Sequence, residues 1–156
     1  MHQTLETFDY PNSELLATDH WLVLLRPRQV TLGSLILAVR DDIRSLGALP
    51  VSAAQEMPIV VSAIETALRS TLSAEKFNYL CLMMVDPQVH FHVIPRYSRA
   101  ARFDEVEYHD DFWPGPPDVT SALSIGPEAI VRLTETLDSA LAQELEDSLK
   151  NLHGLA

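Results

Sequence analysis

Residues 88–97 read Gln-Val-His-Phe-His-Val-Ile-Pro-Arg-Tyr, and their polar and apolar side chains alternate. Gln88, His90 and His92 occupy every second position, with valine or phenylalanine between them. Successive side chains of a β-strand point to opposite faces of a sheet. The alternation therefore predicts a strand that buries its apolar side chains on one face. On the other face it presents two imidazoles and an amide, which makes this face the expected site of chemistry.

Further strands are expected on both sides of a helical segment. Residues 20–25 and 32–39 are rich in strand formers and are separated by a turn that contains proline, so we predict two adjacent antiparallel strands. Residues 77–85 form another strand candidate. The following Asp86-Pro87 pair predicts a short turn that joins this strand to the histidine strand as a hairpin.

Two helices are expected from apolar residues at helical spacing. The first lies between residues 52 and 72, where Ser52 and Gln55 predict a capping box at its start. Pro58 offers a second possible start, because proline is tolerated in the first turn of a helix. The second helix is expected at residues 127–149, and its apolar stripe serves either its own sheet, which the sequence favours, or a dimer contact.

The order of these elements predicts an α+β fold, with an antiparallel sheet, one inserted helix and a C-terminal helix. The length of 156 residues predicts a single domain over residues 1–156. Residues 104–118 are acidic and contain three prolines, which predicts a stiff, irregular loop.

Composition limits the partners of the chain. A formal charge of −11 argues against nucleic acid, whose binding depends on many Lys and Arg contacts to phosphate. The apolar runs fall far short of the ~20 residues that span a bilayer, so no membrane partner is expected. The first residues carry no basic region followed by an apolar stretch, so the expected location is the cytoplasm. Cys81 is the only cysteine and cannot form an internal disulfide.

Residues 90–96, His-Phe-His-Val-Ile-Pro-Arg, resemble the signature of the histidine triad (HIT) nucleotide hydrolases and transferases, His-x-His-x-His with apolar x. Gln88 stands where this signature has its first histidine. The resemblance covers about residues 15–97, the expected core of the domain. It implies the same α+β fold, a homodimer with a joined sheet and a small-molecule nucleotide as substrate. It also implies that His90 attacks the α-phosphate to form a covalent nucleotidyl-histidine, with His92 as a supporting phosphate contact. No metal or other cofactor is implied.

The chain departs from the family pattern at two places. A glutamine amide at Gln88 can donate to a phosphate oxygen but cannot shuttle a proton, and a positioned acid or base contributes ~10²–10⁴-fold. The Gly-Gln-Ser/Thr stretch often found before the triad is replaced by residues 84–87. An acidic phosphate leaving group needs little protonation. A dinucleoside polyphosphate such as diadenosine tetraphosphate is therefore the favoured substrate.

Four more residues are candidates for substrate binding. The strand spacing of the family places Arg26 at a ribose contact and Ser34 beside the phosphates, although both also fit simple hairpin positions. Arg96 opens an arginine cluster over residues 96–102 that either attracts a polyphosphate or pairs with nearby carboxylates. Trp113 either stacks on a base or anchors its own loop or a dimer contact.

Three rival functions remain open from the sequence. Two histidines at i and i+2 of a strand can bind the same zinc ion, and a carboxylate or His109 would complete a metal-dependent hydrolase. A nucleotide-binding module without turnover follows if Gln88 removes the catalytic acid. In the third reading, His90 and His92 are hydrogen-bonded residues that bind no ligand.

Overall fold

The computed structural model describes residues 3–154. Its elements are, in chain order, α1 (Gln3–Thr7), β1 (Glu14–Ala17), β2 (Trp21–Leu25), β3 (Leu35–Val39), the short 3₁₀ helix η1 (Leu46–Ala48), α2 (Val51–Leu72), β4 (Lys76–Leu80), β5 (His90–Arg96), β6 (Ala101–Phe103), β7 (Val106–Tyr108) and α3 (Pro127–Gly154). Within this part of the chain, five strands form one antiparallel sheet in the order β1-β2-β3-β5-β4, and β6 pairs with β7. The predicted α+β fold is confirmed.

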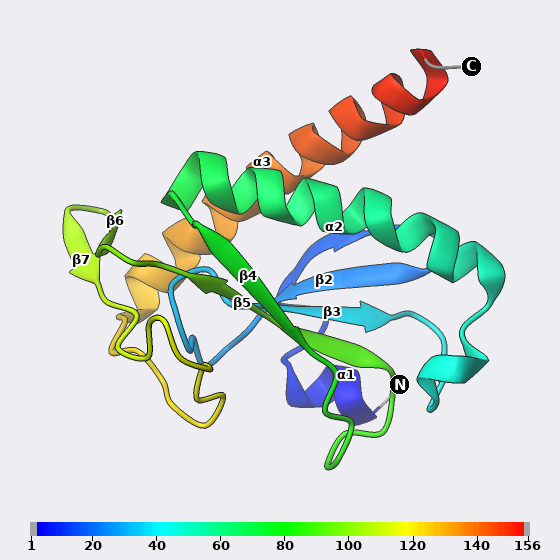
Figure 1. Ribbon diagram of the computed structural model, residues 1–156, viewed down its shortest axis with the longest axis horizontal. Helices are drawn as coiled ribbons and strands as arrows, with labels where there is room; N and C mark the ends of the chain where they lie inside the picture. Colours follow the sequence, from blue (N-terminus) through cyan, green and yellow to red (C-terminus); the bar gives the residue numbers. More distant parts are fainter. Residues whose placement is uncertain (1–2, 155–156) are drawn as a thin grey trace.

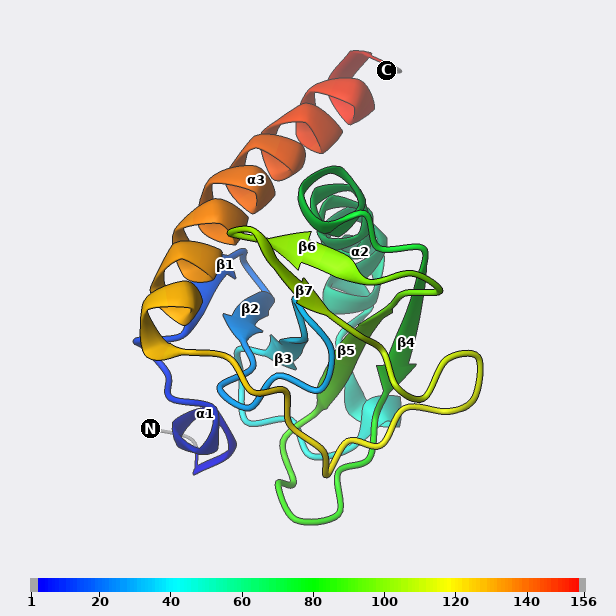
Figure 2. The same cartoon turned by 90° about the vertical axis from the view of Figure 1, so that its left-hand side faces the viewer.

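The sheet separates helices that lie on its two faces (Figure 1). α2 and α3 cover one face, and the small helix α1 lies on the other face, as the turned view in Figure 2 also shows. Leu133, Leu137 and Leu141 of α3 are buried in the larger apolar cluster. This half of α3 therefore covers its own sheet. The last turns of α3 extend beyond the sheet (Figure 1).

Strand register decides which side chains share a face of the sheet. His92 lies opposite Ile36 on β3 and Leu80 on β4, and His90 lies opposite Ala38. Residues directly opposite one another in antiparallel strands project to the same side. The two histidines therefore lie on the face that α1 covers. We call it the histidine face and define it by Leu22, Leu24, Ile36, Ala38, His90 and His92.

The start of α2 differs from the prediction. The helix begins at Val51 with Pro50 at its cap, so Ser52 is already inside the helix and the predicted capping box with Gln55 does not form. Pro58 lies in the interior of the helix and is not its start. The apolar face of α2 is buried on both sides of this proline, and that packing stabilises a helix that local sequence signals would end.

The strand predicted at residues 77–85 is shorter in the structure. β4 ends at Leu80, and residues 81–89 form the connection to β5 in place of the expected short turn. Met83 has a positive φ of 52°, a left-handed conformation that interrupts a strand. Met84 and Val85 are 88% and 90% exposed, so their apolar character does not reflect burial. The predicted antiparallel pairing of this strand with the histidine strand is confirmed.

The segment at residues 104–118 also differs from the predicted irregular loop. Residues 106–108 form β7, which pairs with β6 around a tight turn at Asp104 and Glu105, both with positive φ. The prolines follow this hairpin. Among residues 3–154, no helix combines the length and hydropathy needed to cross a membrane.

Candidate active site

His90 and His92 lie side by side at the start of β5. Their ring centroids are 5.2 Å apart with an interplanar angle of 69°. The side chains are nearly buried, with His90 2% and His92 9% exposed. The β-strand alternation therefore brings the two imidazoles together, as predicted, at a separation that lets both contact one phosphate group.

A main-chain carbonyl orients the ring of His90. Nδ1 of His90 lies 2.6 Å from the carbonyl oxygen of Gln88. Because a carbonyl oxygen only accepts, Nδ1 of the neutral ring carries the proton and donates it. Nε2 then keeps its lone pair, which is the arrangement that a nucleophilic histidine needs.

The side chain of Gln88 forms hydrogen bonds with the main chain at the end of β3. Its Nε2 donates to the carbonyl oxygens of Val39 and Asp41. Its Oε1 is buried and has no hydrogen-bond partner within the described residues. Gln88 itself is 1% exposed. These contacts fix the residue, and through its carbonyl they fix the ring of His90.

His92 is held in its neutral form. Burial, together with the nearby His90 and Arg26, lowers the pKa of His92 from 6.5 to about 4, although Asp86 opposes this shift. Its Nδ1 is buried and has no partner in the part of the chain that the structure describes. At neutral pH the ring of His92 therefore offers one donor and one acceptor and no charge.

This shift makes folding stability depend on pH. Unfolded His92 binds a proton as pH falls below 6.5, whereas folded His92 stays neutral down to about pH 4. As pH falls from 6.5 to about 4, this residue should lower the free energy of unfolding by less than about 3 kcal/mol, because partial solvent screening reduces the effect of the shift. Urea unfolding of the wild type and of His92→Asn at several pH values measures it. The difference between the two proteins should change with pH only in this window, and a constant difference would contradict the assignment.

Arg26 lies close enough to the histidine pair to affect it. Its guanidinium donates to the carbonyl oxygens of Arg28 and, at 2.9 Å, Val119. Burial and, to a lesser degree, the neighbouring Arg28 lower the pKa of Arg26. Its Nε is buried without a partner among the described residues. Arg26 therefore joins the end of β2 to the loop before α3 and places a positive charge near His92.

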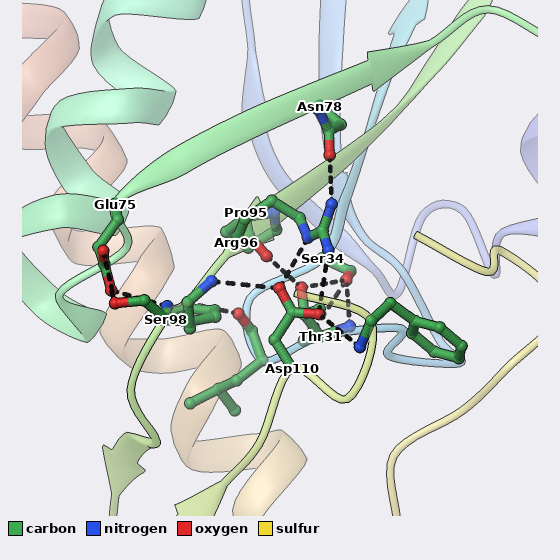
Figure 3. Close-up of polar contacts among 11 residues, drawn as sticks. Thr31, Ser34, Glu75, Asn78, Pro95, Arg96, Ser98 and Asp110 are labelled. Carbon is green, nitrogen blue, oxygen red and sulfur yellow. Dashed lines mark hydrogen bonds and ion pairs between the residues drawn. The ribbon is translucent and has the colours of Figure 1, made fainter. Parts of the chain in front are cut away.

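Arg96 forms a buried ion pair with an acidic residue that sequence reasoning missed (Figure 3). Its Nε lies 2.7 Å from Oδ2 of Asp110, and its Nη1 donates to Oδ1 of Asn78 at 2.8 Å. Oδ2 of Asp110 also accepts from the main-chain N–H of Tyr97. The guanidinium thus attaches the proline-rich loop to β4 and β5. Its charge is neutralised by the protein itself.

These structural features have parallels among solved structures. A histidine triad protein from Marinobacter aquaeolei is 25% identical, with a TM-score of 0.67 over 83% of this chain and 88% of that chain. One from Sinorhizobium meliloti is 22% identical, with a TM-score of 0.65 over 92% and 95%. The chain has the histidine triad fold. A hypothetical histidine triad nucleotide-binding protein from Sulfolobus tokodaii is 16% identical, with a TM-score of 0.56 over 84% of each chain. No family model and no curated protein matches the chain.

In this histidine triad fold, Ser34 belongs to the turn between β2 and β3. It is fully buried, and its Oγ donates to the carbonyl oxygen of Thr31 at 2.7 Å and accepts from the N–H of Thr31 (Figure 3). Gly33 next to it has a φ of 85°, which glycine adopts without strain. The hydroxyl of Ser34 is therefore occupied in closing the turn.

A cavity lies at the β4 side of the sheet, and neither His90 nor His92 lines it. It has a volume of about 420 Å³ and is lined by Asn78, Tyr79, Leu80, Arg96 and residues 114–117. Leu80 lies opposite His92 in the sheet, so the cavity begins one strand away from the imidazoles. Trp113 precedes the prolines of its wall, and its main-chain N–H donates to the carbonyl oxygen of Asp110.

The arginine cluster predicted after the histidine strand does not converge. Arg96 is buried on the histidine side, whereas Arg99 and Arg102 are exposed and line a separate cavity with Glu75. No group of three or more His, Cys, Asp or Glu side chains between residues 3 and 154 is placed to hold a metal ion.

Proposed function

We propose that this chain is a nucleotide hydrolase or nucleotidyl transferase that uses His90 as its nucleophile. The observation that carries the proposal is the 2.6 Å contact between Nδ1 of His90 and the Gln88 carbonyl, which leaves Nε2 as the free base. The neutral ring of His92 lies beside that of His90 and can form a hydrogen bond with a phosphate. The name of the Sulfolobus neighbour, a nucleotide-binding protein, supports a nucleotide as the ligand.

The proposed reaction has two displacements at phosphorus. Nε2 of His90 attacks the α-phosphorus, the bond from phosphorus to the bridging oxygen breaks, and the leaving phosphate departs with the electron pair. The imidazolium formed keeps its proton on Nδ1 and donates it to the Gln88 carbonyl. Water then attacks phosphorus and gives up a proton to solvent, the N–P bond breaks, the electron pair returns to Nε2, and a nucleoside monophosphate is released. A different acceptor in place of water makes the protein a transferase.

The contacts of Gln88 limit which leaving groups the proposed reaction can use. Its amide nitrogen already donates to Val39 and Asp41, and an amide does not supply a proton as an acid does. The favoured substrate is therefore a dinucleoside polyphosphate such as diadenosine tetraphosphate, whose leaving phosphate is stable without protonation.

Replacing Gln88 with histidine tests this account of the leaving group. Hydrolysis of diadenosine tetraphosphate should change less than about 3-fold, whereas turnover of a nucleoside phosphoramidate should rise by ~10²-fold, because an amine leaving group needs a general acid. Gln88→Asn keeps an amide and should not raise phosphoramidate turnover. Equal effects of Gln88→His on both substrates would contradict the account.

Hydrolysis of diadenosine tetraphosphate in the presence of a chelator, with calorimetric binding of the same compound, tests the proposed function. Turnover that survives the chelator supports a metal-independent hydrolase. Loss of turnover with stoichiometric metal in the untreated protein would favour the metal-dependent rival. Binding without turnover would make the chain a nucleotide-binding module. The predicted homodimer and cytoplasmic location stay predictions.

A further inference from the structure

Phe8 lies against both imidazoles of the histidine face. Its ring centroid is 5.5 Å from that of His90 and 5.8 Å from that of His92, the second contact being edge to face at 81°. Phe8 is itself 7% exposed and packs with Leu5 of α1 in the apolar cluster of this face. The N-terminal segment thus supplies an aromatic cover for the histidine pair.

This cover is attached differently at its two ends. At its C-terminal end, Oγ of Ser13 donates to the Phe8 carbonyl at 2.5 Å, and the N–H of Leu25 on β2 donates to the Ser13 carbonyl at 2.8 Å. α1 is attached to the loop before β5 by side-chain hydroxyls. Thr4 Oγ1 accepts from the N–H of Gln88 at 3.3 Å, and Thr7 Oγ1 donates to Oδ1 of Asp86 at 3.1 Å.

The burial of His90 conflicts with access by a substrate. A phosphorus atom must come within about 3–3.5 Å of the nucleophile before it reacts. His90 is only 2% exposed, and Phe8 is the aromatic side chain packed on both imidazoles. Phe8 therefore leaves little of either ring open to an approaching phosphate group.

We propose that Phe8 is a positioning residue of the histidine site: its ring excludes water from both imidazoles, and it moves aside with α1 when a phosphate ligand approaches His90. The identity of that ligand rests on the proposed function. The segment then moves about its anchor at Ser13, and the hydroxyl contacts of Thr4 and Thr7 break. An aromatic ring suits this role because it covers two imidazoles at once and brings no polar atom of its own.

The protonation of His92 reports on this cover. The charged or titratable groups that act on His92 are His90 on its own strand, Arg26 at the end of β2 and Asp86 in the loop before β5, and burial has the largest effect on its pKa. Removal of the Phe8 ring admits water and leaves those three groups in place. The pKa of His92 should then rise from about 4 toward the ordinary value of 6.5.

Two measurements on Phe8→Ala, Phe8→Leu and the control Val131→Ala, at an exposed position of α3, test the proposal. The first is the NMR titration of His92, and the second is the rate of carbethoxylation of each histidine, read by peptide mapping. Phe8→Ala should raise the His92 pKa by ~1 unit or more and speed modification of His90 and His92 about 10-fold. Phe8→Leu, which keeps an apolar cover, and Val131→Ala should stay close to wild type. His153, at the end of α3, serves as an internal reference.

A reversible lock gives a test that does not depend on removing the ring. Thr7→Cys and Asp86→Cys, made together with Cys81→Ser, place a thiol pair where the side chains now touch. Oxidation should slow modification of His90 and His92 and stop turnover of diadenosine tetraphosphate, and reduction should restore both. Modification unaffected by either the lock or Phe8→Ala would overturn the proposal for Phe8. If modification of His90 and His92 changes as expected but no variant hydrolyses diadenosine tetraphosphate, the proposed function is overturned. The role of Phe8 then still stands.

Discussion

Replacing His90 with alanine should lower kcat for diadenosine tetraphosphate by at least ~10³-fold, because it removes the nucleophile of a covalent pathway. The backbone of β5 stays paired on both sides, with β3 and with β4, so the fold should be kept. Binding of the nucleotide should weaken far less than kcat falls. Steady-state kinetics and calorimetry on the same preparation measure the two effects.

Two control variants limit what this result means. His153→Ala, at the exposed end of α3, should leave kcat unchanged. His92→Ala should cost less than His90→Ala, because His92 makes a phosphate contact and does not form the covalent bond. If His92→Ala removes activity and His90→Ala keeps it, the nucleophile has been assigned to the wrong ring.

Replacing Asp110 with alanine should lower the free energy of unfolding by about 3–5 kcal/mol, because it leaves a buried arginine charge without its partner. The side chains of Arg96 and Asp110 are only 5% and 0% exposed. Asp110 also accepts from the main-chain N–H groups of Tyr97 and Phe112, which would lose their acceptor. Urea unfolding measures the loss.

An exposed ion pair of the same chain provides the matched control. Arg132 and Asp104 pair across the surface with side chains 50% and 35% exposed, so Arg132→Ala, which leaves the backbone at Asp104 unchanged, should cost far less stability than Asp110→Ala. The double variant Arg96→Met with Asp110→Leu should be more stable than Asp110→Ala, since it removes both charges. A loss in Asp110→Ala no larger than that in Arg132→Ala would show that the buried pair does not hold the loop.

The parts of the fold that were predicted correctly are those with a local pattern. Alternation in residues 88–97 placed His90 and His92 on one face, and helical spacing identified α2 and α3. The strand at residues 77–85 was predicted too long, because exposed apolar residues such as Met84 and Val85 look the same in sequence as buried ones. The left-handed backbone conformation at Met83 interrupts the extended chain, and sequence alone does not reveal it.

The parts of the site that were not predicted depend on contacts between distant segments. α1 has only five residues, too few for a helical period, and its contact with Gln88 spans 84 positions. Asp110 is one of several acidic residues after Arg96, and charge alone does not indicate which of them pairs with this arginine. The folded hairpin of β6 and β7 brings Asp110 to Arg96. Ser34 and Trp113 stay predictions as ligand contacts.

The central claim, a covalent bond between a nucleotide and His90, is tested most directly by mass spectrometry of the protein during turnover. Rapid denaturation of wild type mixed with diadenosine tetraphosphate should trap a mass increase of one nucleotidyl group. Peptide mapping without acid should place it on residues 90–96, and His90→Ala should show none. An adduct elsewhere, or full turnover with no adduct at any quench time, would contradict the account.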